Sequence, residues 1–193
     1  MEEKIRKKIE VGKRITEREA LWLFENKDLM FLAELATMRR RYHVGEDAFY
    51  QYNFNINHTN ICENKCSLCA FYRDEEQGYT LSLDEIESNV RAAYSKGVNE
   101  VHIVGGLNKK LPLSYFTEML ERIKRIDPLI HIQAFTPVEI DFFARISNLS
   151  TREVLDVLRT AGLDTLPGGG AEIFSERVRA LICTEKISGD EWL

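Results

Sequence analysis

The stretch that decides the fold is residues 60–71, NICENKCSLCAF, which places Cys62, Cys66 and Cys69 at the spacing CxxxCxxC. It directly follows YNFNIN (residues 52–57), in which polar and apolar residues alternate as they do in a β-strand. The cysteines therefore lie in a loop at the carboxyl end of a predicted first strand. Barrel enzymes place their chemistry in loops of this kind.

Beyond the cysteine loop, short apolar runs alternate with longer amphipathic segments, which is typical of βα units in a parallel sheet. Helices are predicted over residues 82–96, 113–126, 138–146 and 150–162. Further strands are predicted at EVHIV, LIHIQAF and LDTLP, which occupy residues 100–104, 129–135 and 163–167. The glycines that follow are predicted to form a loop opening directly onto a helix, in GGGAEIFSERVRALI (168–182).

About four such units form the first half of an eight-fold βα barrel, a fold that typically takes about 250 residues. The fold class is therefore α/β, with a partial TIM-type barrel over residues 53–193. Residues 1–52 are predicted to be an N-terminal helical extension, on the evidence of TEREALWLFEN and DLMFLAELATMRRRYH. Because a free half-barrel exposes unpaired parallel edges, we expect either a truncated barrel or a half-barrel that another chain completes. We also expect the 193 residues to be inactive by themselves.

Composition excludes several classes of protein. With 44% hydrophobic and 30% charged residues, the chain can bury a core and is not compositionally disordered. A net charge of −5 argues against a nucleic-acid partner, because such binding draws on clustered lysine and arginine. No stretch is long and apolar enough to span a membrane, and the start of the chain lacks a signal peptide's apolar core. We therefore expect a cytoplasmic location.

In a reducing compartment, three closely spaced cysteines indicate metal or redox chemistry rather than disulfides. A structural zinc would need four ligands, and His58 or Cys183 could supply the fourth, which leaves a non-catalytic zinc module open. An iron-sulfur cubane ordinarily takes four thiolates. With only three supplied, one iron keeps an open coordination site, as catalysis requires.

The CxxxCxxC loop after a first strand, followed by a second strand ending in Gly105 and Gly106, resembles the radical S-adenosylmethionine (SAM) superfamily. The resemblance implies that each of the three cysteines ligates one iron of a four-iron four-sulfur cluster. It also implies that SAM binds the fourth iron and is cleaved to a 5′-deoxyadenosyl radical. An electron donor such as flavodoxin or ferredoxin is implied as a partner.

The same resemblance assigns further residues to the cofactor. The Gly-Gly pair meets the amino group of SAM, and the residue before the third cysteine, usually aromatic, contacts the adenine. Here that residue is Leu68, for which Phe71 or Tyr72 could compensate. A second departure is GGLNKK, where family members usually read GGLHP. Gln133, at the end of a predicted strand, is the remaining candidate cofactor residue.

Several stretches resemble the menaquinone-biosynthesis members of the futalosine route, in order and spacing. They are INHTNICENKCSLCAFYR, VHIVGGLNKKLPLSYFTEML, HIQAFTPVEI, AGLDTLPGGGAEIF and KISGDEWL. The aminofutalosine synthases of that group add the deoxyadenosyl radical to an aromatic carboxylate, 3-[(1-carboxyvinyl)oxy]benzoate. The dehypoxanthine futalosine cyclases close a ring instead, and deazaflavin-forming enzymes are more distant. HIVGGL, FTPVEI and GGGAEIF favour the synthase, and the cyclase is the alternative.

The remaining candidates surround the mouth of the predicted barrel. The glycine loop and the helix after it would offer an anion site for a carboxylate. Two glutamates near that mouth could bind ribose hydroxyls or take a proton, and His58 lies at a strand end on the same face. These candidate substrate or anion residues are His58, Glu139, Gly168, Gly169, Gly170 and Glu172. No catalytic residue is assigned.

Overall fold

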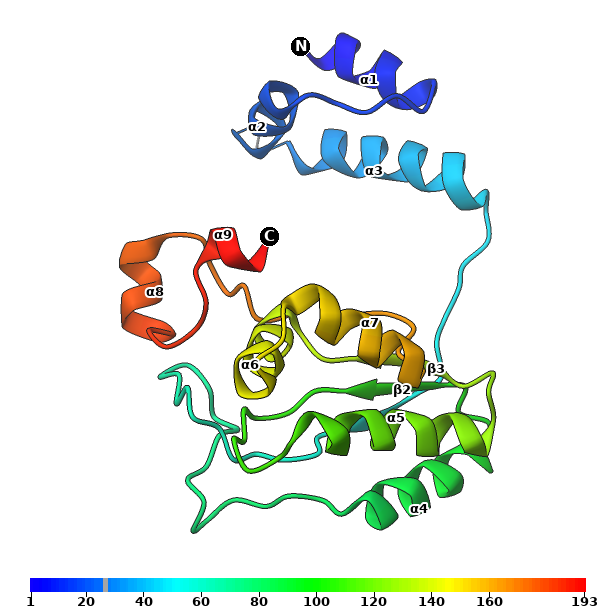
Figure 1. The fold of residues 1–193 in the computed structure, drawn as a ribbon. Helices are drawn as coiled ribbons and strands as arrows, with labels where there is room; N and C mark the ends of the chain where they lie inside the picture. Colours follow the sequence, from blue (N-terminus) through cyan, green and yellow to red (C-terminus); the bar gives the residue numbers. More distant parts are fainter. Residues whose placement is uncertain (26–27) are drawn as a thin grey trace. The chain divides into compact units, whose positions relative to one another are not determined.

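The computed structural model describes residues 1–25 and 28–193, which form two compact units, Met1–Tyr50 and Gln51–Leu193. The ribbon in Figure 1 shows three helices in the first unit and a parallel sheet with its helices in the second. No helix in the described ranges has the length and apolar character needed to cross a membrane.

The first unit consists of α1 (Glu2–Glu10), α2 (Glu17–Glu25) and α3 (Leu29–Val44). A small core holds it together, formed by Ile5, Ile9, Phe31 and Leu35. The start of α2 follows the predicted capping pattern, because the Thr16 amide donates to Glu19 Oε2 (2.7 Å) and the Glu19 amide donates to Thr16 Oγ1 (3.3 Å). The end of the predicted TEREALWLFEN helix, Asn26, lies outside the described residues.

The second unit is built on a parallel sheet in the order β1 (Asn53–Ile56), β2 (Glu100–Ile103), β3 (His131–Ala134). Asn53 pairs with Glu100, and Glu100 pairs with His131, so the strands are in step and their carboxyl ends lie at one edge. This confirms the predicted α/β fold and the order of its first three strands.

One face of the sheet carries the core. Val101, Ile103, Ile132 and Ala134 are fully buried, whereas His102 between the first two is only half-buried. The covering helices are α4 (Leu83–Tyr94), α5 (Leu113–Ile126), α6 (Pro137–Ser147) and α7 (Thr151–Ala161). Helix α5 contacts both α4 and α7, and α6 contacts α7, as the ribbon shows.

Capping boxes fix the starts of α4, α6 and α7. Ser82, Thr136 and Ser150 each accept a hydrogen bond from the amide of a glutamate three residues later, whose side chain bonds back to the cap. Each pattern is legible in the sequence, which explains why the predicted helix starts agree closely with the structure.

The predicted fourth strand, LDTLP, is much shorter than expected. Only Thr165 pairs with β3, in an isolated bridge to Gln133, with hydrogen bonds from the Ala134 amide to Thr165 O (2.9 Å) and from the Thr165 amide to Ile132 O (3.2 Å). Pro167 has no amide hydrogen to continue the ladder, and glycines follow it, so the chain leaves the sheet.

The predicted junction between the glycine loop and a helix was also wrong. Helix α8 (Glu176–Ile182) begins six residues after Gly170, and the intervening segment is irregular. The glycines therefore do not supply the amides of a helix N-terminus. Instead, the indole of Trp192, in α9 (Gly189–Trp192), donates to Gly169 O at 3.0 Å.

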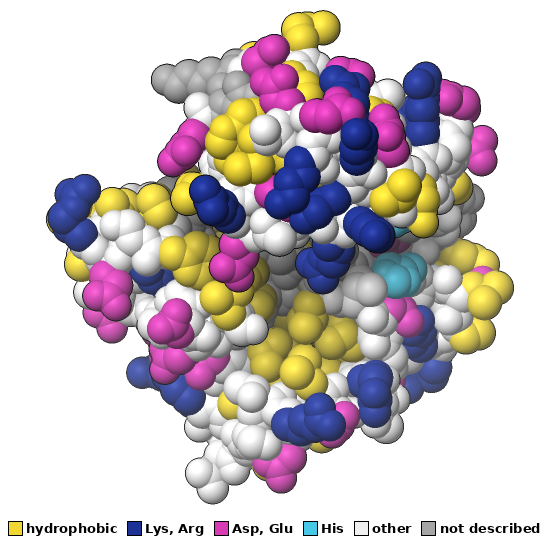
Figure 2. Space-filling model, turned by 90° about the horizontal axis from the view of Figure 1, so that it is seen from above, with side chains coloured by type: hydrophobic (Ala, Val, Ile, Leu, Met, Phe, Trp, Pro, Cys, Tyr) yellow, Lys and Arg dark blue, Asp and Glu magenta, His cyan; other side chains and the backbone are white. Residues whose placement is uncertain are grey.

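Both acidic and basic side chains occur on the surface shown in Figure 2, and several lysines and arginines lie close together near its centre. Many charged side chains of the chain form ion pairs, such as Lys110 with Glu75 at 2.6 Å and Arg122 with Glu118 at 2.7 Å.

Candidate functional site

The cysteine loop is folded back on itself by backbone bonds. The Arg73 amide donates to Asn60 O (2.8 Å), and the Leu81 amide donates to His58 O (2.8 Å). The buried hydroxyl of Thr59 donates to Tyr79 O at 2.6 Å. These bonds hold residues 73–81 beside residues 58–60. The segment that carries the three cysteines is therefore a loop whose two ends are joined by hydrogen bonds.

A second attachment reaches the far end of the chain. The Ser67 hydroxyl lies 2.9 Å from Leu181 O and 3.4 Å from Ile182 O, at the end of α8. Cys66 and Cys183, which flank these contacts, are both buried. The loop is thus fixed from both sides.

The Gly-Gly pair after β2 makes room for the cysteine loop. A Cβ atom on Gly106 would lie 2.2 Å from the backbone oxygen of Ile61, and one on Gly105 would lie 2.3 Å from Cε1 of His58. No side chain fits at that distance, and a backbone oxygen cannot rotate away. The glycines are therefore required by the packing of the loop itself, a reason that the sequence did not reveal.

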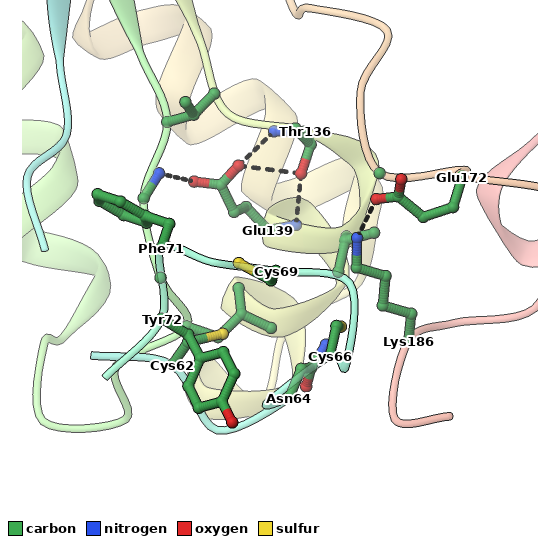
Figure 3. A pocket seen from close by; sticks show the side chains of 16 residues that line it. Cys62, Asn64, Cys66, Cys69, Phe71, Tyr72, Thr136, Glu139, Glu172 and Lys186 are labelled. Carbon is green, nitrogen blue, oxygen red and sulfur yellow. Dashed lines mark hydrogen bonds and ion pairs between the residues drawn. The ribbon is translucent and has the colours of Figure 1, made fainter. Parts of the chain in front are cut away.

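A cavity of about 180 Å³ opens beside this junction, and Figure 3 shows the side chains around it. Its wall brings together many of the predicted residues, which come from the cysteine loop, the end of β2, the first turn of α6 and the loop after Pro167. These residues are Cys62, Cys66, Cys69, Phe71, Tyr72, Gly105, Gly106, Glu139, Gly170 and Glu172.

Other predicted residues do not line the cavity. Leu68 is 48% exposed, Gln133 is half-buried in β3, and of the three consecutive glycines only Gly170, not Gly168 or Gly169, reaches the wall. Since these glycines also lie away from a helix N-terminus, the predicted anion site at the start of a helix is not formed.

His58 is packed behind the cavity rather than in it. Its ring meets Phe116 edge to face at a centroid distance of 5.3 Å, and burial lowers its pKa to about 4. Within the described residues, neither ring nitrogen has a hydrogen-bond partner. The imidazole is therefore neutral near pH 7 and serves as packing under Gly105.

Glu139 links two strand ends across the cavity wall. Its Oε1 accepts from the Gly105 amide at 3.1 Å, and its Oε2 accepts from the Thr136 amide (2.8 Å) and hydroxyl (2.9 Å). Burial raises the pKa of this carboxyl to about 7, and the hydrogen bonds from Thr136 and Gly105 oppose the rise. The side chain can therefore hold or release a proton near neutral pH.

Three polar cavity residues were missed by the sequence reasoning: Asn64, Thr136 and Lys186. Thr136 could have been found, because it starts the capping box that ends in Glu139. Lys186 had no local signal. It lies far along the chain in KISG, and only the tertiary fold brings its ammonium group to Glu172, with which it forms an ion pair in the cavity wall.

The thiols have the character of cluster ligands. All four cysteines of the chain are free, and the three loop cysteines face one cavity. Burial raises the pKa of the Cys66 thiol, and the Lys186 ammonium opposes that rise. A single zinc needs all its ligands within about 2.3 Å of one point. Among the described residues, no three His, Cys, Asp or Glu side chains are grouped to hold one ion. Three thiols that line one cavity suit a cluster in which each cysteine binds its own iron.

The relatives found by sequence comparison include two kinds of enzyme. The aminodeoxyfutalosine synthase of Thermus thermophilus is 38% identical over 98% of this chain, and that of Streptomyces coelicolor is 34% identical over 100%. A 5-amino-6-(D-ribitylamino)uracil–L-tyrosine 4-hydroxyphenyl transferase from Synechocystis is 44% identical over 80% of this chain. The matches cover 51%, 50% and 41% of these relatives, so the chain spans about half their length.

Solved structures and a family model agree on the fold. Methylornithine synthase (PylB) superposes with a TM-score of 0.70 at 20% identity, covering 97% of this chain and 52% of that one. The family model for the radical SAM superfamily matches residues 56–193, which include the cysteine loop and the whole cavity wall. The chain therefore belongs to the radical SAM superfamily, whose proteins use a four-iron four-sulfur cluster held by three cysteines together with SAM.

Proposed function

We propose that this chain belongs to an aminodeoxyfutalosine synthase, which joins the 5′-deoxyadenosyl group of SAM to 3-[(1-carboxyvinyl)oxy]benzoate. The observation that carries the proposal is the match to the Thermus and Streptomyces synthases, which extends over 98% and 100% of this chain. The match thus includes the N-terminal helical unit as well as the barrel.

In this proposal, Cys62, Cys66 and Cys69 hold the cluster at the mouth of the cavity. The cluster and SAM, when bound, supply the one-electron chemistry that produces the carbon radical. The chain's own residues bind and orient. The amides of Gly105 and Gly106 already donate to Glu139 Oε1 and to Thr59 O, so a ligand's amino group would meet the carbonyl oxygens of this turn.

In this proposal, Phe71 and Tyr72 make the aromatic contact with the adenine of SAM. Both line the cavity, whereas Leu68 is outside its wall. A flat ring offers an aromatic ligand a stacking partner that leucine cannot provide. The departure at Leu68 is therefore compensated within the same loop.

Polar groups on the opposite wall would complete the site. Glu139, with its pKa raised to about 7, would bind or release a proton near neutral pH. In the ion pair, Glu172 would accept a hydrogen bond from a ligand hydroxyl, and Lys186 would bind a ligand carboxylate. The electron would come from a low-potential carrier such as flavodoxin or ferredoxin. Four free thiols suit a reducing compartment such as the cytoplasm.

A second candidate is the tyrosine 4-hydroxyphenyl transferase activity. It is favoured by the 44% identity to the Synechocystis protein, which exceeds the identity to either synthase over a shorter range. Both candidates use the same cluster and SAM site and differ in the molecule that the radical attacks. The futalosine cyclase remains a third option on motif grounds.

Anaerobic turnover assays decide between the synthase and the transferase. The full protein, reconstituted with iron and sulfide, is incubated with SAM, a reductant and either 3-[(1-carboxyvinyl)oxy]benzoate or L-tyrosine with 5-amino-6-(D-ribitylamino)uracil. A SAM-derived adduct with the first substrate alone supports the synthase. Turnover with the second pair alone supports the transferase, and the Cys66→Ala variant serves as the inactive control for either.

A further inference from the structure

Helix α8 is anchored by a charge rather than by an apolar face. Arg179 is its one buried residue, at 6% exposure, while Leu181 on the same helix is 69% exposed. Surface helices ordinarily bury an apolar stripe, and a buried charge is costly unless it is well paired. Among the described residues, the partners of Arg179 are three backbone carbonyls and not a carboxylate.

The positions of those carbonyls are informative. Nη1 of Arg179 donates to the carbonyls of Ala171 and, at 2.9 Å, of Ile173, which flank Glu172 on both sides. Nη2 donates to the carbonyl of Ile187, directly after Lys186. One rigid guanidinium thus fixes the backbone beside both members of the Glu172–Lys186 ion pair.

The backbone conformation of Glu172 is unfavourable unless neighbouring contacts hold it. Its φ of +57° is in the left-handed region, which residues other than glycine rarely occupy. Conformations of this kind persist where surrounding contacts enforce them, and they concentrate at functional sites. Here the two carbonyl contacts on either side of Glu172 supply the constraint.

The ion pair that results has a defined place in the cavity. Glu172 and Lys186 line the same wall as the three cysteines. Glu139 lines it too, so the ion pair shares the cavity with the three thiols and with the buried carboxyl.

We propose that Arg179 is a positioning residue, which holds the Glu172–Lys186 pair in the orientation that SAM meets in the cavity. Arg179 does not line the cavity, and it would act through the two side chains whose neighbouring backbone it holds. The inference rests on the assignment of this cavity to SAM.

The first test needs no cofactor. Glu-C protease cleaves after glutamate, and cleavage after Glu172 is compared with cleavage after the exposed Glu76 in the same molecule. Losing charge-assisted hydrogen bonds should speed cleavage after Glu172 about tenfold in Arg179→Lys and Arg179→Gln. Arg177→Gln, on an exposed residue of the same helix, should leave the ratio unchanged. A wild-type ratio in Arg179→Gln would overturn the proposal.

The second test separates positioning from general stability by a double-mutant cycle. In the reconstituted protein, Arg179→Lys should raise the Kd for SAM about tenfold at unchanged iron content, and should add nothing in a Glu172→Gln/Lys186→Met background. An equal further loss in that background would overturn the role. If the wild type binds no SAM, the cavity assignment fails, while the proteolysis still decides whether Arg179 orders the loop.

Discussion

The amide of Gly105 donates to Oε1 of Glu139 at 3.1 Å, which joins the turn after β2 to the first turn of α6. The same carboxyl closes the capping box with Thr136. One buried side chain therefore holds two strand ends together and faces the cavity between them.

The protonation of Glu139 should make stability depend on pH. Its pKa is raised from 4.5 to about 7 by burial, so its contribution is fully present below pH 4.5 and is lost as pH rises through 7. The shift corresponds to roughly 3 kcal/mol at most. Urea unfolding of the apoprotein should show this decline, and Glu139→Gln should flatten it. Glu153→Gln, in the exposed capping box of α7, is the matched control; a decline that persists unchanged in Glu139→Gln would assign it to another group.

Gly106→Ala should disrupt the cysteine loop. The added Cβ would lie 2.2 Å from Ile61 O, so the backbone of the loop must shift. We expect iron incorporation to fall well below that of the wild type, with a lower Tm. Gly168→Ala is the control, because nothing lies within 4 Å of its added Cβ. Iron content equal in the two variants would refute the steric argument.

Phe71 and Leu68 should differ in their effect on SAM. Phe71→Leu removes a ring from the cavity wall and should raise the Kd of the reconstituted protein severalfold, since an aromatic contact contributes about 0.5–1.5 kcal/mol beyond its area. Leu68→Ala should change the Kd little, because Leu68 lies outside the wall. Titration of SAM measures both values, and the reverse ranking would return the adenine contact to Leu68.

Glu19 should stabilise the N-terminal unit only above acidic pH. Hydrogen bonds from Lys8 and from the Thr16 amide lower its pKa from 4.5 to about 2. The contribution is therefore present above pH 4.5 and is lost as pH falls through 2. Glu19→Gln should lower the Tm near pH 7 and leave it unchanged near pH 2. Glu17→Gln, exposed on the same helix, should have little effect at either pH.

Local signals predicted most of the fold. The cap residues Ser82 and Ser150 and the glycine after α7, Gly162, mark helix ends by chemistry that involves only neighbouring residues. The prediction of the fourth strand was wrong because a strand forms only where a neighbouring strand pairs with it. Thr165 meets β3 at one point, and nothing in LDTLP itself says how far the pairing extends.

The sequence likewise predicted those parts of the site that directly follow strands, but not those placed by tertiary contacts. The cysteines and the Gly-Gly turn follow strands directly, so their meeting at one edge of the sheet follows from parallel topology. Lys186 and Arg179 act across loops whose path is decided by tertiary contacts, such as the Trp192 indole on Gly169 O. No spacing rule relates them to the cysteines.

The bond from the Ser67 hydroxyl to Leu181 O spans 114 residues of sequence. During synthesis, the loop that carries the three thiols emerges long before the segment that fixes its outer side. Contacts of such high sequence separation form late, after the loop-closure entropy has been overcome. A nascent chain therefore presents its thiols on a loop that is fixed on one side only, and the wall of the pocket is complete only after α8 has been made.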